Sequence, residues 1–181
     1  MVQFLNAIEI AIINKNWYSA LALSLTLPDI CGKVISPSQP SGPRYRKWFD
    51  KYLASEYSYT RPRSSEIVSF LTSPDFYALR CSVLHEGTAD ISHQKIQEVL
   101  DKFIITPPFD EGSFHCMQAK ITKKNGDEIW VLQLQADIFC RQICQATKQC
   151  ISEHQELFNS YAPITLKIKD LMSHQNDLNK L

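Results

Sequence analysis

The spacing of apolar residues changes twice along this chain, and these changes restrict its fold more than any other feature. Before about residue 102 the apolar residues follow a helical period. Between about residues 102 and 135 they form short strand-like runs, and residues 124–127 (Lys-Asn-Gly-Asp) predict a hairpin turn. A helical period then returns from residue 136 to about 161 and ends before Pro163. The pattern predicts a mainly α fold: a helical bundle with a small antiparallel β-sheet insertion and a long C-terminal helix.

A length of 181 residues suits one domain with its own core, and no flexible linker divides the chain. We therefore expect a single helical domain over residues 1–162, with the β insertion at about 102–135. A polar C-terminal tail is expected over 163–181. Short helices are expected over 66–71 and 93–100, and a turn over 58–64.

Charge and hydropathy exclude several functional classes. The chain has 19 Lys and Arg against 19 Asp and Glu, so bulk attraction to nucleic acid is not expected. Its longest clean apolar stretch, residues 17–27, is far shorter than the roughly 20 residues that span a bilayer. No Lys or Arg precedes Lys15, unlike a secretory signal, and the six cysteines contain no Cys-x-x-Cys pair. These features favour a cytoplasmic protein with reduced thiols and no membrane contact.

One predicted helix carries an arginine among its apolar residues. Residues 73–75 (Ser-Pro-Asp) predict the helix start, and the helix is expected to reach His85 with Gly87 as its C-cap. At about 100° per residue, Arg80 falls inside the apolar arc of this helix, whereas His85 projects about 140° away from it. A guanidinium on a buried face is costly unless it is paired or used.

Two explanations for Arg80 stay open. It can snorkel, or pair with an acid from an apolar helix such as Glu9 or Asp29. Alternatively, it belongs to a functional site. Asp29 itself either caps the helix after Pro28, pairs with Arg80, or orients a site residue.

Residues 79–87 (Leu-Arg-Cys-Ser-Val-Leu-His-Glu-Gly) resemble the Arg-x4-His signature of the HEPN superfamily. These are compact helical domains, many of them ribonucleases in toxin–antitoxin, abortive-infection and CRISPR-type antiviral defence. A hydrophobic residue precedes Arg80, hydrophobic residues precede His85, and a glycine follows two places after it. The chain departs from the pattern at Cys81, where active members commonly carry Asn, Asp or another polar residue.

The resemblance implies RNA cleavage without a metal or cofactor, through attack of the 2′-hydroxyl on the adjacent phosphorus. His85 would move protons, and Arg80 would hold the phosphate and offset its developing charge. Asp29 and Cys81 would support these two residues. The resemblance also implies a homodimer in which two motifs face each other, and an antitoxin or another protein partner is compatible with it.

Basic and aromatic residues alternate between residues 44 and 63. This segment holds six Lys and Arg against two acids, a local charge of +4. Its aromatic residues from Tyr45 to Tyr52 follow a helical spacing that predicts a core face. The predicted RNA-binding side chains are therefore the basic ones: Arg44, Arg46, Lys47, Arg61 and Arg63.

Three functions remain open from the sequence. The first is an RNA endonuclease of a defence or toxin system. The second is a HEPN-like interaction or RNA-binding module without activity, in which Arg80 is structural and Cys81 marks lost chemistry. The third is an unrelated helical domain whose β insertion binds a partner protein.

Cys140 and Cys144 lie one helical turn apart, but they share an apolar face and are expected in the core rather than on a metal.

Overall fold

The computed structural model describes residues 1–110 and 112–162, and both helices and strands are substantial in these residues. Helices make up 52% and strands 17%, and the strands form two small sheets. The fold is therefore mixed α/β, and the prediction of a mainly α fold with a long C-terminal helix is wrong. No helix in these two ranges is long and apolar enough to cross a membrane. The predicted tail, 163–181, lies outside the described residues.

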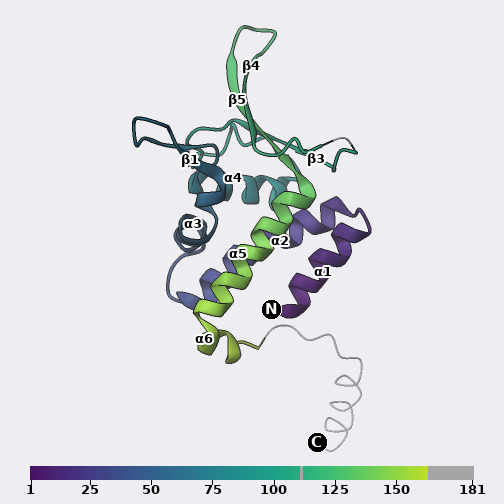
Figure 1. Cartoon of the computed structure of the whole chain (residues 1–181), viewed down its shortest axis with the longest axis vertical. Coiled ribbons are helices and arrows are strands. Elements are labelled where there is room, and N and C mark those ends of the chain that lie inside the picture. Colours follow the sequence, from purple (N-terminus) through teal and green to yellow (C-terminus); the bar gives the residue numbers. More distant parts are fainter. Residues whose placement is uncertain (111, 163–181) are drawn as a thin grey trace, which may run out of the picture.

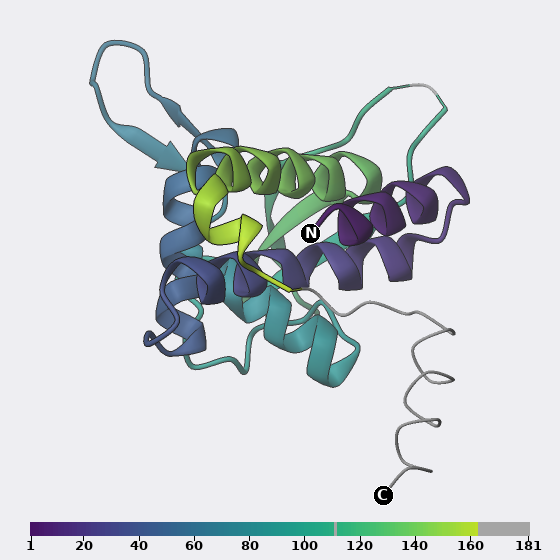
Figure 2. The same ribbon diagram turned by 90° about the horizontal axis from the view of Figure 1, so that it is seen from below.

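Helix α2 (Trp17–Ile35) lies in the middle of the helical part. Asn16 caps its start, because the Asn16 side chain accepts a hydrogen bond from Ser19 N at 3.2 Å. The helices that pack against α2 are α1 (Val2–Ile13), α3 (Ser41–Tyr52) and α5 (Ala136–Glu153), whereas α4 (Ser73–Cys81) packs against α3. Figure 2 shows α4 on the side of α2 opposite to α5.

The aromatic face of α3 joins these helices, as its spacing predicts. Tyr45 is fully buried, and its hydroxyl donates to Leu25 O on α2 at 3.1 Å. Phe49 is also buried, and its ring lies 4.9 Å from that of Phe76 on α4. Burying each large ring stabilises the fold by about 2–3 kcal/mol. These contacts fix α3 against α2 and α4 against α3, and so place their polar residues near one another.

The predicted β insertion forms a three-stranded sheet in the order β3-β5-β4. Strands β4 (Met117–Thr122) and β5 (Glu128–Gln135) pair antiparallel through the predicted hairpin turn. Strand β3 (Lys102–Thr106), however, runs parallel to β5, so the sheet is mixed rather than antiparallel. Residues 107–127 connect the two parallel strands, and β4 within this connection brings the chain back to the end of the sheet where β5 must start. Figure 1 shows the β4–β5 hairpin projecting away from the helices.

A second, two-stranded sheet replaces the predicted turn over 58–64 and the predicted helix over 66–71. Strands β1 (Ser58–Thr60) and β2 (Ile67–Ser69) pair antiparallel. Ile67 and Val68 are β-branched and favour a strand over a helix. Arg63 closes the turn between the strands with a positive φ of 74°.

The helix predicted over 93–100 is wrong, because the chain forms turns there and the end of the segment bonds to the side chain of Asp75. This carboxyl is fully buried, and its Oδ1 accepts hydrogen bonds from Glu98 N at 2.7 Å and from Val99 N at 3.3 Å. Thr72 is the N-cap of α4, in place of the expected Ser73, and its hydroxyl donates to Asp75 Oδ2 at 2.9 Å. Burial raises the pKa of Asp75, although these hydrogen bonds oppose the shift.

The C-terminal helical region is in two pieces rather than one long helix. α5 ends at Glu153, and the short α6 (Gln155–Asn159) begins after His154. His154 has φ −125° and ψ 34°, away from helical values, and this interrupts the helical hydrogen bonding. The break turns α6 towards the end of α2, with which it is in contact.

His115 attaches the sheet region to α5 and should make stability depend on pH. Its Nδ1 accepts a hydrogen bond from Gln135 N at 3.1 Å, and its Nε2 lies 3.0 Å from Gln142 Oε1. The ring is therefore neutral with its proton on Nε2, and burial lowers the pKa of His115 below 6.5. As the pH falls through 6.5, the unfolded chain takes up this proton before the folded one does, so the folded state loses stability.

We expect the free energy of unfolding, measured in urea, to be lower at pH 5.0 than at pH 7.5. In the His115→Gln variant this decrease should be smaller, because the buried imidazole that takes up a proton on unfolding is gone. The other histidines are unchanged. Equal pH dependence in the two proteins would contradict the assignment.

Candidate functional site

The helix that carries Arg80 changes its geometry one residue further on. After α4, a π-helical turn, η2 (Ser82–Glu86), continues the helix without a break and ends at Gly87, which has a φ of 68°. The Gly87 N–H donates to Ser82 O, five residues back, as a π turn requires. A π turn contains more residues than an α turn, so a side chain five places along returns towards the face from which it started. Turns of this kind are frequent at functional sites.

The π turn brings Arg80 and His85 together. Arg80 Nη1 lies 3.0 Å from His85 Nε2. The expectation that these side chains diverge by about 140° is therefore wrong, because it assumed α-helical geometry throughout. A guanidinium can only donate, so Nε2 of His85 is the acceptor in this contact.

Asp29 on α2 holds Arg80 from the side of the core. Its Oδ2 lies 3.6 Å from Arg80 Nη2, and its Oδ1 lies 2.8 Å from Arg44 Nη2 on α3. The side chains of Arg80, Asp29 and Arg44 are 17%, 23% and 14% exposed, so water screens both ion pairs only partly. Glu9, the other acid considered for Arg80, instead pairs with Arg141 at 3.2 Å.

The arrangement combines a cation paired on its core side with an accessible imidazole. His85 is exposed, whereas Arg80 is half-buried and pairs through Nη2 with Asp29. Cys81 lies beside this pair, with its Sγ 4.0 Å from Arg80 Nη1. Burial raises the pKa of the neighbouring Tyr77, so its phenol stays protonated. Chemically, the site can bind an anion through Arg80 and exchange a proton through His85.

Removal of Asp29 should destabilise the fold by about 2 kcal/mol, because it leaves two half-buried arginines without their carboxylate. We expect this loss in the free energy of unfolding of Asp29→Ala, measured with urea. Glu66→Ala provides a matched control: it also removes an arginine's partner, Arg61, but both side chains are more than half exposed. The control should lose less than about 0.5 kcal/mol. Equal losses would show that Asp29 has no special role.

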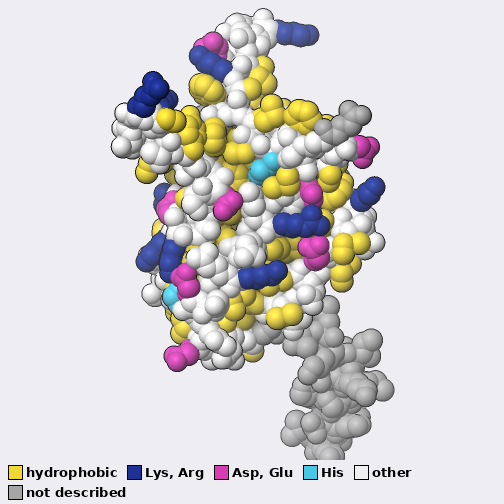
Figure 3. Space-filling view, viewed as in Figure 1, with side chains coloured by type: hydrophobic (Ala, Val, Ile, Leu, Met, Phe, Trp, Pro, Cys, Tyr) yellow, Lys and Arg dark blue, Asp and Glu magenta, His cyan; other side chains and the backbone are white. Residues whose placement is uncertain are grey.

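The five basic residues predicted to bind RNA do not form one surface. Arg44 belongs to the Asp29 network, Arg46 is half-buried and Lys47 is exposed on α3. Arg61 and Arg63 lie on the β1–β2 hairpin, where Arg61 pairs with Glu66 at 2.7 Å. In Figure 3 the basic side chains at the tip of this hairpin are separated from those over α3 by uncharged surface. Of the five, Arg44 is connected to Arg80, because both pair with Asp29.

Lys51, the sixth basic residue of the 44–63 segment, and His154, which the sequence pattern does not single out, lie near Lys47. Lys51 and His154 share a small pocket with it. The three-residue and four-residue spacing of Arg44, Lys47 and Lys51 on one helix could have indicated this stripe. His154 could not be found in this way, because a helix break brings it there.

Neither a metal site nor a known relative adds evidence about the function of this site. Within residues 1–110 and 112–162, no three His, Cys, Asp or Glu side chains gather as a metal site. All six cysteines are free, and Cys140 and Cys144 are buried on α5, as their apolar surroundings predict. Compared with protein-family models, curated proteins and solved structures, the chain has no significant match.

Proposed function

We propose that this chain is a HEPN-like RNA endonuclease of a defence or toxin system that cleaves without a metal. The observation that carries the proposal is the 3.0 Å contact between Arg80 Nη1 and His85 Nε2. A cation and a proton carrier at hydrogen-bond distance are the groups that phosphoryl transfer to a 2′-hydroxyl needs. Both also occupy the positions of the Arg-x4-His signature that the sequence resembles.

In the proposed reaction, Arg80 turns from His85 to the oxygens of the bound phosphate. Nε2 of His85 is then free to take the proton of the RNA 2′-hydroxyl. The 2′-oxygen bonds to phosphorus while the bond from phosphorus to the 5′-oxygen breaks, and His85 returns its proton to that leaving oxygen. The products are a 2′,3′-cyclic phosphate and a 5′-hydroxyl. Asp29 limits the positions of the guanidinium, which lowers the cost of orienting it.

Incubation of the purified protein with labelled RNA in EDTA tests the proposal. We expect cleavage with cyclic-phosphate and 5′-hydroxyl ends, and its loss in Arg80→Ala and His85→Ala. Cleavage that survives both substitutions, or none by any preparation, would exclude the proposed nuclease.

The inactive HEPN-like module is the second candidate, and the Arg80–Asp29 ion pair favours it. That pair gives Arg80 a structural partner in the absence of any substrate. In this case Arg80→Ala would lower stability and weaken RNA or protein binding, with no cleavage to lose.

The proposal includes a cytoplasmic location and protein partners. Six free thiols support a reducing compartment. The homodimer now depends on the family resemblance alone, because one chain already joins Arg80 to His85. A protein partner, such as an antitoxin, has a candidate surface on the projecting hairpin, where Met117, Ile121 and Trp130 are 50%, 42% and 41% exposed.

A further inference from the structure

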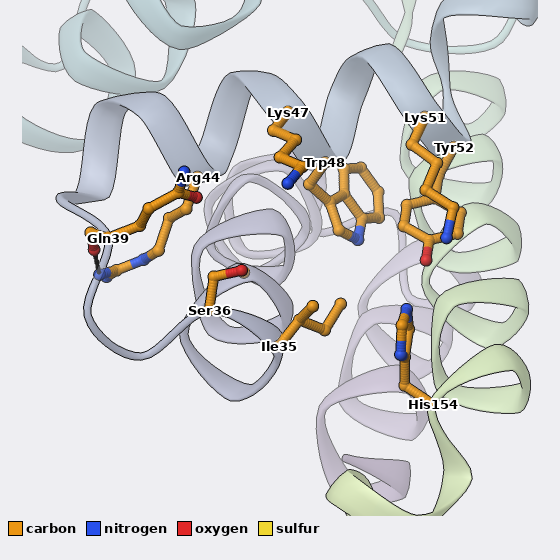
Figure 4. A pocket seen from close by; sticks show the side chains of 10 residues that line it. Ile35, Ser36, Gln39, Arg44, Lys47, Trp48, Lys51, Tyr52 and His154 are labelled. Atoms are coloured by element: carbon orange, nitrogen blue, oxygen red, sulfur yellow. Dashed lines mark hydrogen bonds between the residues drawn. The ribbon is translucent and has the colours of Figure 1, made fainter.

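One face of α3 forms the basic wall of a small pocket. The pocket has a volume of about 180 Å³ and lies between α3 and the end of α2, with His154 at its other side (Figure 4). The α3 residues that line it are spaced by three and four, so they form a single stripe along the helix. These are Arg44, Lys47, Trp48, Lys51 and Tyr52.

The charged side chains that line this pocket are basic, and Arg44 among them pairs at 2.8 Å with Asp29, which lies outside the lining. No Asp or Glu occurs among the residues that line it. Lys51 pairs at 2.7 Å with Glu153, which lies outside the lining, and this hydrogen bond raises the Lys51 pKa, so the ammonium stays charged. Within the described residues, Lys47 has no carboxylate within ion-pair distance. In Figure 4 its Nζ points over the pocket, between Arg44 and Trp48.

The remaining walls combine apolar surface with hydrogen-bond donors. Ile35 and the rings of Trp48 and Tyr52 form the apolar part. The hydroxyl of Ser36 points into the same space as Lys47 in Figure 4. Trp48 is 3% exposed, and its indole N–H lies by the sulfur of Cys150.

We propose that this pocket binds the phosphate of a phosphate ester. The cations of α3 and the Ser36 hydroxyl at the end of α2 suit a tetrahedral anion, whereas the apolar walls suit the sugar or base attached to it. The volume is below the roughly 300 Å³ of common small-molecule sites, so it holds the phosphate and only part of the attached group. Neither Arg80 nor His85 lines the pocket, although Arg44 shares Asp29 with Arg80, so the binding test uses a different variant, at Lys47.

Equilibrium binding tests the pocket with four probes: inorganic phosphate, adenosine 5′-monophosphate, adenosine, and a 2′-O-methyl oligonucleotide that cannot be cleaved. We expect saturable binding of the monophosphate at one site per chain, and none of adenosine. In Lys47→Glu, affinity for the monophosphate should fall about tenfold or more, because a cation is replaced by an anion. Lys124→Glu, on the exposed hairpin turn, changes the net charge equally and should bind like the wild type.

The outcomes separate the possible sources of the phosphate. If the oligonucleotide binds more tightly than the monophosphate, the ligand is an RNA-chain phosphate, and if both bind equally, it is a free ester. The indole N–H resonance of Trp48 should shift in the wild type as the monophosphate is added. The proposal is overturned if the wild type binds neither phosphate ester saturably, or if the two lysine variants lose affinity equally. If Arg80→Ala loses cleavage but binds the monophosphate normally, phosphate binding by this pocket is separate from cleavage.

Discussion

Replacement of His85 by alanine is expected to lower the rate of RNA cleavage by about 10²–10⁴-fold, the usual contribution of a positioned proton carrier. The imidazole is the exposed partner of the pair, and its Nε2 lies 3.0 Å from Arg80 Nη1. Its removal takes away proton transfer but leaves the Arg80–Asp29 pair in place. Binding of RNA should therefore change much less than the rate. Single-turnover cleavage with excess enzyme measures the rate separately from binding.

His93→Ala is the matched control for this prediction. His93 is also an exposed histidine, and it pairs with Glu86 at 2.7 Å rather than with Arg80. The variant should cleave RNA at nearly the rate of the wild type. Equal losses in both variants would assign the effect to general disturbance of this segment and not to proton transfer by His85.

Replacement of Asp75 by alanine should lower the free energy of unfolding by about 3–5 kcal/mol, the range for breaking a buried charged hydrogen-bond network. The carboxyl is fully buried and accepts hydrogen bonds from Glu98 N, Val99 N and the Thr72 hydroxyl. Without it, these donors are left near the core with no acceptor. Urea unfolding at neutral pH measures the loss.

Two further variants sharpen this prediction. Asp75→Asn keeps one acceptor oxygen at the same place and should be less damaging than Asp75→Ala. Asp50→Ala changes an exposed aspartate on α3 and should alter stability by less than about 0.5 kcal/mol. A loss below about 1 kcal/mol in Asp75→Ala would mean that Asp75 does not hold the 98–100 segment in place.

Local patterns predicted the parts of the fold that depend on local interactions. The aromatic spacing of α3 placed Tyr45, Trp48, Phe49 and Tyr52 in the core, where they are 7% exposed or less. The turn at residues 124–127 identified the β4–β5 hairpin. In both cases neighbouring residues in the sequence determine which side is buried.

Long-range contacts explain most of the failures. The 93–100 segment has a helical pattern, but the side chain of Asp75 takes up its backbone donors from more than twenty residues away. The parallel pairing of β3 with β5 depends on which edge of β5 the hairpin leaves free. The basic residues separate because β1 and β2 form a hairpin that carries Arg61 and Arg63 away from Arg44.

The residues of the candidate site could be predicted from the sequence, but their relative positions could not. The resemblance singled out Arg80 and His85, and the apolar setting of Asp29 made it a possible partner of Arg80. The π turn at Ser82–Glu86 has no local signature of residue types, so a constant 100° per residue gave the wrong relative direction for His85.

The central claim is that Arg80 and His85 act as one catalytic unit, and the cleavage rates of four proteins test it most directly. These are the wild type, Arg80→Ala, His85→Ala and the double variant, compared on the same RNA under single-turnover conditions. Residues that act together are strongly non-additive, so the double variant should be little slower than the slower single variant. If the fold losses of the two single variants multiply in the double variant, the two residues do not act as one unit. Four equal rates would contradict any role for this pair in cleavage.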